Sequence, residues 1–405
     1  SLIRKKQQKS YQEATELELD IILRCRLLRG IDRKTALFHL RAMWHAMGVV
    51  LDRIKPCLIL TETIDSYVID ILHFQAKLKN IKIIGLVPTF ISGYFRISVR
   101  GEFVLSRTVA EDEIQSVLNM LLKSDYLPDF VQTSKQRFSM LPTRRWLNNL
   151  SKIPYFWLKR LNPRGRYVLH NWAALIMAKQ WAHLWPVSYL GDFNWRNRLL
   201  NSKKPVIYIP LQLIPEATVD YWCADLAAVN YDAYLIRLVS YLKNDFTIFF
   251  KEHPNALGYR NPILYDQLCQ ADSLFFVPTN VPSQQLIEAC DAVLVWTGSV
   301  GFEAALRGKP VLTTCEPYYA SGISFKKINL QTPISEIMEF LQSFDAGFAM
   351  SHRSEMLAHL LSGVLPGRYI INGSWSASEA AHVEYAKSIA IQLRGYLAFS
   401  GKKHT

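Results

Sequence analysis

Short apolar runs alternate with longer amphipathic segments along most of the chain. In the first half, apolar runs at 57–60 and 82–87 lie on either side of a helical segment at 66–78. This order is typical of a βαβ unit with parallel strands. The same alternation resumes after residue 203, so the pattern predicts an α/β protein. The strands expected in the second half are 206–209, 246–250, 274–277 and 293–296, and the helices are 231–243, 283–290 and 376–396.

The chain has 405 residues, half of them hydrophobic, which suits two domains with their own cores. We expect a first domain at 1–200 and a second at 201–385. Residues 386–405 end the last helix, which we expect to fold back across the first domain.

A loop of small residues follows the strand expected at 293–296 and opens a helix. Free backbone N–H groups and the positive end of the helix dipole meet at such a loop, which favours an anion. Gly298 lets a phosphate approach the backbone, and the hydroxyls of Thr297 and Ser299 can add hydrogen bonds. Glu303 lies on the first helical turn, where a carboxylate can bind a ribose diol. The loop predicts a nucleotide site, and an ordinary strand–turn–helix connection is the alternative.

Lys251 and His253 follow the strand expected at 246–250 and can supply cationic or hydrogen-bonding groups for a phosphate. The carboxyl ends of parallel strands meet at one edge of a sheet, so both should lie near the small-residue loop. A structural histidine is the alternative for His253. The loop after the next strand holds Thr279 and Asn280, and its backbone is placed to recognise a base edge.

Two acidic residues follow the strand expected at 206–209. Glu216 and Asp220 are four residues apart, on one face of a helix that Pro215 can start. Two carboxylates at a strand end suit sugar chemistry, with one as nucleophile or base and the other tuning it. Stabilisation of a helix N-terminus by acidic residues is the alternative.

Glu62 follows the first expected strand, where a side chain can face a ligand, although helix capping is its alternative. Arg96 could bind a carboxylate or phosphate through two parallel hydrogen bonds. An exposed cross-strand arginine is the alternative.

The formal charge of +13 favours an anionic partner. Aromatic residues alternate with Lys and Arg at 144–186, a pattern that suits a membrane surface or a single nucleic-acid strand. Packing within a helical region between domains is the alternative. Binding of nucleic acid is not expected, because no recognised module accompanies the charge.

Six widely spaced cysteines, without a CxxC pair, indicate reduced and mostly buried thiols of a cytoplasmic protein. No apolar run is long enough to span a bilayer, and no signal-peptide pattern opens the chain. We therefore expect the protein in the cytoplasm, at the inner face of the membrane.

Three motifs occur in a characteristic order, and together they cover about 205–315. They are Pro-Leu-Gln-x-x-Pro-Glu-Ala-Thr, Lys-Glu-His-Pro and Thr-Gly-Ser-x-Gly-Phe-Glu-Ala-x-x-x-Gly-Lys-Pro-Val. In these motifs the chain resembles the bacterial capsule-polysaccharide-biosynthesis glycosyltransferases. Within that group it most closely resembles the retaining β-Kdo transferases, including the type that caps O-antigen chains.

The resemblance implies a GT-B architecture, in which two Rossmann-like domains face a cleft. It implies CMP-β-Kdo as donor, bound mainly by the second domain, and retention at the anomeric carbon. Asp220 would be the catalytic carboxylate that forms a covalent glycosyl-enzyme, and Glu216 would be its neighbour. The residues that the resemblance assigns to the CMP part are Lys251, His253, Thr297, Gly298, Ser299 and Glu303.

The resemblance also implies a glycan acceptor, which we expect to be lipid-linked. Capsule-initiating members tend to carry an acidic residue before Gly-Phe, whereas this chain has Ser92-Gly93-Tyr94-Phe95, which favours an O-antigen-type acceptor. No cofactor or metal is expected, because no Asp-x-Asp motif is present. The alternatives are a sugar-nucleotide 2-epimerase, a glycerophosphate transferase that uses CDP-glycerol, and a basic adaptor without catalytic activity.

Overall fold

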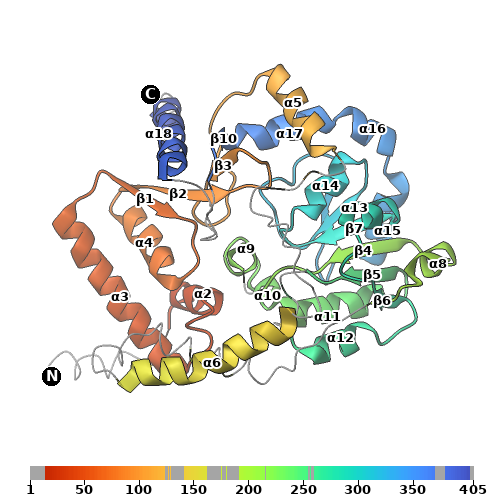
Figure 1. Cartoon of the computed structure of the whole chain (residues 1–405), viewed down its shortest axis with the longest axis horizontal. Helices are drawn as coiled ribbons and strands as arrows, with labels where there is room; N and C mark the ends of the chain where they lie inside the picture. The colour runs from red at the N-terminus through yellow and green to blue at the C-terminus, as the bar shows by residue number, and fades with distance from the viewer. Residues whose placement is uncertain are drawn as a thin grey trace.

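The computed structural model describes residues 14–123, 141–161, 191–369 and 379–401, without positions 215, 254–255 and 257–259, and also the single positions 126, 128, 175 and 179. Figure 1 shows two α/β units, with the N-terminal helices and a small sheet on one side and a larger sheet on the other. The two units, each built around its own sheet, confirm the expected fold class.

The small sheet has the strand order β1-β2-β3-β10. Its strands are β1 (Leu58–Glu62), β2 (Lys82–Pro88), β3 (Tyr94–Ile97) and β10 (Val364–Pro366). The pair β1–β2 is parallel, as expected for a βαβ unit, whereas β3 runs antiparallel to both β2 and β10. The reversal occurs at Gly93, whose φ of 80° is readily adopted only by glycine.

The large sheet is entirely parallel, with the order β6-β5-β4-β7-β8-β9. Its strands are β4 (Val206–Pro210), β5 (Thr247–Lys251), β6 (Leu274–Phe276), β7 (Ala292–Val295), β8 (Val311–Thr313) and β9 (Phe325–Lys327). Nearly every residue of β4 to β8 is buried, which explains why these strands are continuous apolar runs in the sequence.

The first unit is built mainly from long helices. They are α2 (Glu16–Arg24), α3 (Arg33–Ile54), α4 (Tyr67–Leu78), α5 (Glu111–Leu121) and α6 (Leu141–Leu161). A core cluster joins α2, α3 and α4. The helix α18 (Glu379–Gly401) packs over the small sheet through Tyr396, which joins a cluster with Ile84 and Phe95. None of the described helices is long and apolar enough to cross a membrane.

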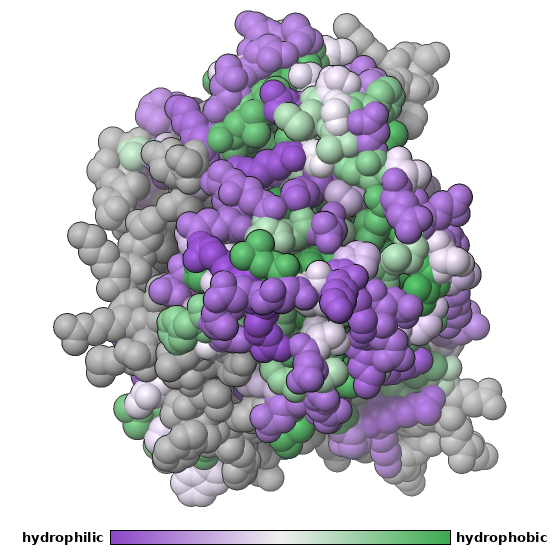
Figure 2. Space-filling view, turned by 90° about the vertical axis from the view of Figure 1, so that its right-hand side faces the viewer, coloured by the Kyte–Doolittle hydropathy of each residue, from purple (hydrophilic) through white to green (hydrophobic). Residues whose placement is uncertain are grey.

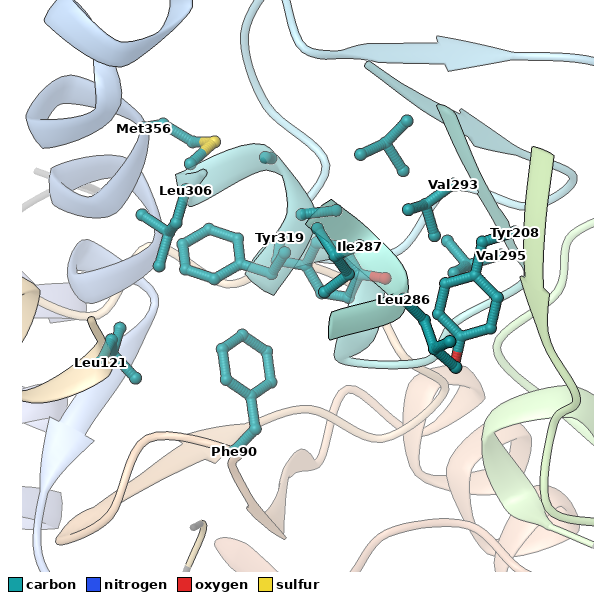
Figure 3. Close-up of a cluster of buried hydrophobic side chains, with 14 of the residues drawn as sticks. Phe90, Leu121, Tyr208, Leu286, Ile287, Val293, Val295, Leu306, Tyr319 and Met356 are labelled. Atoms are coloured by element: carbon teal, nitrogen blue, oxygen red, sulfur yellow. The ribbon is translucent and has the colours of Figure 1, made fainter. Parts of the chain in front are cut away.

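Helices cover both faces of the large sheet. They are α8 (Trp195–Leu200), α9 (Ala217–Asp220), α10 (Leu226–Val229), α11 (Tyr231–Leu242), α12 (Pro262–Leu268), α13 (Ser283–Glu288), α14 (Val300–Leu306), α15 (Ile334–Ser343), α16 (Ala346–Ser351) and α17 (Arg353–Ser362). One of the two core clusters of this unit reaches the first unit, because the Phe90 ring lies 5.3 Å from that of Phe302 and 5.8 Å from that of Tyr319. Figure 3 shows Phe90 entering this cluster from the first unit.

The predicted domain division at 1–200, 201–385 and 386–405 stays a prediction. The chain already returns to the small sheet at β10, before it continues into α18.

The cysteine prediction was wrong in part. Cys223 and Cys315 form a disulfide, with their Cα atoms 5.2 Å apart. Their separation of 92 residues in sequence hid this proximity, which arises because the loops after α9 and β8 meet in the fold. Cys57 and Cys269 are exposed, whereas Cys25 and Cys290 are buried.

Candidate active site

The predicted donor residues stand at the carboxyl edge of the large sheet. Lys251 ends β5, and the loop 296–299 follows β7, with β4 between these two strands. All three strands are parallel, so the segments that follow them lie along one edge. Thr279 is half-buried and Asn280 is exposed, both in the loop after β6 at the end of the sheet.

Lys251 and Glu303 influence each other electrostatically across this edge. Burial lowers the pKa of Lys251 to about 8, and the negative charge of Glu303 opposes the shift. Burial raises the pKa of Glu303, whereas Arg307, a hydrogen bond from Ser299 and Lys251 lower it. The Lys251 Nζ donates to the Ser283 hydroxyl at 3.2 Å, and the Ser299 hydroxyl donates to Glu303 at 3.4 Å. The edge therefore holds an amine whose charge depends on pH near neutrality.

In the loop between β7 and α14, the backbone at Gly298 lies close to Gln212, and the hydroxyl of Thr297 forms no hydrogen bond with the described residues. A Cβ atom at Gly298 would lie 3.2 Å from the side-chain oxygen of Gln212. The Thr297 hydroxyl is buried and has no hydrogen-bond partner among the described residues. Gly301 has a packing role, because a Cβ there would lie 2.8 Å from a Val295 methyl carbon.

The Lys-Glu-His segment is fixed by a buried ion pair that sequence reasoning missed. The Glu252 carboxylate accepts from Arg260 at 2.7 Å and from the Tyr265 hydroxyl at 2.8 Å. It also accepts from the backbone N–H of His253 at 2.7 Å. His253 is half-buried, and positions 254–255 lie outside the described residues. The acidic residue between Lys251 and His253 was the feature of the sequence that could have indicated this ion pair.

Asp220 lies one helical turn after Glu216, since the Asp220 amide donates to the Glu216 carbonyl at 3.1 Å. Pro215 lies outside the described residues, and the helix begins at Ala217. The Glu216 carboxylate accepts from Gln212 at 3.0 Å and from Thr218 at 2.8 Å. Burial raises the pKa of Glu216, while these two hydrogen bonds lower it. Gln212 therefore connects Glu216 with the loop at Gly298.

Asp220 is buried and is paired with two arginines from the turn after α2. Arg29 Nη1 donates to Oδ1 at 2.7 Å, and Arg26 Nε lies 3.2 Å from Oδ2. Oδ2 accepts no hydrogen bond from the described residues. These arginines supply the cationic neighbours that an ionised nucleophile needs. They are more than 190 residues away in sequence, and no local pattern pointed to them.

Arg24 fixes the backbone on the other side of Asp220. It donates to the carbonyls of Cys223 at 2.6 Å, Ala224 at 3.0 Å and Asp220 at 3.2 Å. A buried guanidinium that satisfies three carbonyls holds this loop against α2.

The two predicted acceptor residues have different surroundings. Arg96 is only 1% exposed. Its guanidinium carbon lies 3.8 Å from the ring centre of Tyr318 and 4.6 Å from that of Trp222. Arg96 therefore lies within the contact between the two units and is not the exposed arginine of the alternative. Its burial lowers its pKa to about 10. Glu62 is exposed at the end of β1. The burial of Tyr369 and the negative charge of Glu62 together raise the pKa of Tyr369 to about 12.

The described part of the chain contains no group of three or more His, Cys, Asp or Glu residues that could hold a metal ion. The expectation of a reaction without a metal stays a prediction.

Residues 164–331 match the family model described as capsule polysaccharide biosynthesis protein. The matched region contains the three motifs and agrees with the resemblance described from them. No curated protein matches the chain.

Among solved structures, the chain is similar to the β-Kdo 2,7 transferase of KpsC from Thermosulfurimonas dismutans. That pair is 14% identical, with 77% of this chain and 78% of the other covered and a TM-score of 0.35. The β-Kdo 2,4 transferase of the same protein is 12% identical, with 71% and 74% covered and a TM-score of 0.33. UDP-GlcNAc 2-epimerase from Neisseria meningitidis is 14% identical, with 80% of each chain covered and a TM-score of 0.28.

Proposed function

We propose that the protein is a glycosyltransferase that transfers Kdo from CMP-β-Kdo to a glycan acceptor with retention, in O-antigen or capsule polysaccharide synthesis. The observation that carries the proposal is the Asp220 carboxylate, which is paired with Arg26 and Arg29 and is adjacent to Glu216. The family match and the three motifs add support.

In the first step, Asp220 Oδ2 forms a bond to the anomeric carbon while the bond to the CMP phosphate oxygen breaks. CMP leaves with the electron pair of that bond. Oδ2 suits this role because no hydrogen bond from the described residues engages it. Lys251 and His253, with the loop 297–299, would stabilise the charge on the departing phosphate.

In the second step, the acceptor hydroxyl attacks the same carbon and the ester bond to Asp220 breaks. Glu216 would take the hydroxyl proton, which fits a carboxylate whose pKa is raised by burial. Two inversions at one carbon give net retention. Glu303 would bind the ribose of CMP, and the backbone around Thr279 and Asn280 would contact the base.

We further propose that the acceptor is lipid-linked and that α6 contacts the inner face of the inner membrane. Tyr155, Trp157 and Leu158 are exposed on this helix, next to Lys152 and Lys159. Exposed aromatic and apolar side chains beside lysines suit an anionic membrane surface. The rest of the predicted basic and aromatic segment, from residue 162, falls outside the described residues apart from positions 175 and 179. On the face shown in Figure 2, hydrophobic residues form small separate groups among hydrophilic residues.

The test is intact-mass spectrometry after incubation with CMP-Kdo. We expect a mass gain of one Kdo, mapped to Asp220, and no gain in the Asp220→Asn variant. Asp225→Asn, which changes an exposed carboxylate five residues away, should still form the adduct. Absence of CMP release with every glycan acceptor would refute the proposal and favour the epimerase, glycerophosphate transferase or adaptor alternatives.

A further inference from the structure

The turn after α2 places more positive charge beside Asp220 than one carboxylate requires. Arg26 and Arg29 both pair with Asp220. Arg26 also influences Glu216, whose pKa burial raises, so this second acid is less readily ionised. Two permanent cations therefore lie beside the Asp220 carboxylate.

The two arginines retain capacity to bind a further group. Arg26 Nε is buried and has no hydrogen-bond partner among the described residues. The side chains of Arg26 and Arg29 are 24% and 34% exposed, whereas that of Asp220 is 3% exposed. The guanidinium groups are therefore accessible to solvent, whereas the Asp220 carboxylate beneath them is not.

Arg24 differs from this pair, although it comes from the same segment. Its guanidinium is fully engaged with the carbonyls of the loop 220–224 and the carboxylate of Asp20. This division leaves Arg26 and Arg29 as the two arginines of the segment that can exchange one anion for another.

We propose that Arg26 and Arg29 bind a carboxylate that is attached directly to the reacting carbon of the donor. This inference rests on the proposed function and assigns two residues to the carboxylate of its donor. A donor of this class carries its negative charge next to the carbon that Asp220 attacks. Two anions at that distance repel each other unless cations lie beside both.

Binding would exchange one ion pair for another. The donor carboxylate would take over Arg29 from Asp220 Oδ1, while Arg26 stays beside Oδ2. The charges of the arginines remain paired throughout, and Asp220 becomes accessible. A neutral hexose could not replace Asp220 on Arg29, so uncovering the nucleophile would leave charges unpaired. The arginine pair therefore selects donors by the charge on their reacting carbon.

The test compares the KM for CMP-Kdo with the inhibition constant of CMP, which lacks the sugar carboxylate. We expect Arg29→Gln and Arg26→Gln to raise the KM by about 10- to 100-fold, as for loss of a charged hydrogen bond. The inhibition constant of CMP should change less than about two-fold, because CMP does not reach the arginines. Arg29→Lys keeps the charge but loses the planar fork, and it should lie in between.

Arg53→Gln removes an exposed arginine from the end of α3 and should leave both constants unchanged. An equal rise in both constants, or an unchanged KM, would overturn the inference. A measurement without any variant uses CMP-Kdo with its carboxylate converted to an amide, which the wild-type protein should turn over at least about 10-fold less efficiently. Equal turnover of amide and acid would overturn the arginine assignment alone, whereas no release of CMP from CMP-Kdo would overturn the proposed function as well.

Discussion

Arg260 offers a direct test of how the Lys-Glu-His segment is held. Its guanidinium is fully buried and forms two hydrogen bonds with Glu252, at 2.7 and 3.1 Å. It also donates to the Gln212 carbonyl at 2.6 Å and lies 3.2 Å from Asp232. Replacing Arg260 by Met would leave Glu252 as a buried carboxylate without a cation, since its other hydrogen-bond donors, the Tyr265 hydroxyl and the His253 backbone N–H, are neutral.

Removal of one partner from a buried ion pair costs about 3–5 kcal/mol. We therefore expect Arg260→Met to lower the free energy of unfolding by that amount in urea denaturation. Adding Glu252→Gln should restore about 2 kcal/mol, because the remaining side chain is then neutral and can still form hydrogen bonds. Arg237→Met, on the exposed face of α11, should change stability by less than about 0.5 kcal/mol.

Arg260→Met should also weaken the binding of CMP, because His253 and Lys251 flank the unpaired Glu252. Isothermal titration calorimetry would measure this effect in buffer without denaturant. A loss of less than about 1 kcal/mol in Arg260→Met, or a double variant less stable than the single one, would contradict the reasoning.

The remaining predictions concern charge, membrane contact and the disulfide. Since the pKa of Lys251 is about 8, its charge is present below that pH, and the inhibition constant of CMP should rise as the pH increases from 7 to 9.5; a constant value would argue against contact between Lys251 and the phosphate. Trp157→Ser and Leu158→Ser should reduce cosedimentation with anionic vesicles, and unchanged binding would exclude α6 as the contact. Cys315→Ser, which breaks the bond to Cys223, should lower the free energy of unfolding by about 2–4 kcal/mol, whereas equal stability with or without dithiothreitol would contradict a stabilising disulfide.

Local patterns were sufficient where a residue's position follows from its own strand. Lys251 and Ser299 could be placed at one edge because β5, β4 and β7 are continuous apolar runs, and the ends of parallel strands coincide. The position of Asp220 one helical turn after Glu216 followed from helical spacing alone.

Contacts between the units were not accessible in the same way. Arg26 and Arg29 lie in a turn without periodicity, and their partner Asp220 is more than 190 residues away. Arg96 was considered as a ligand-binding or exposed arginine, yet it stacks between Tyr318 and Trp222 from the other unit. Such contacts depend on how two separately predictable units dock, which the spacing of residues within either unit does not encode.

The position of β10 has a consequence for synthesis on the ribosome. β3 pairs with β10 along its outer side, and these strands lie roughly 270 residues apart, so at 5–20 residues per second the outer side of β3 waits roughly 15–50 s for its neighbour. An open strand edge is a template for pairing with another chain. During this interval the nascent protein depends on a chaperone or on dilution to avoid such pairing, so slower induction, which lowers the concentration of nascent chains, should increase the soluble yield.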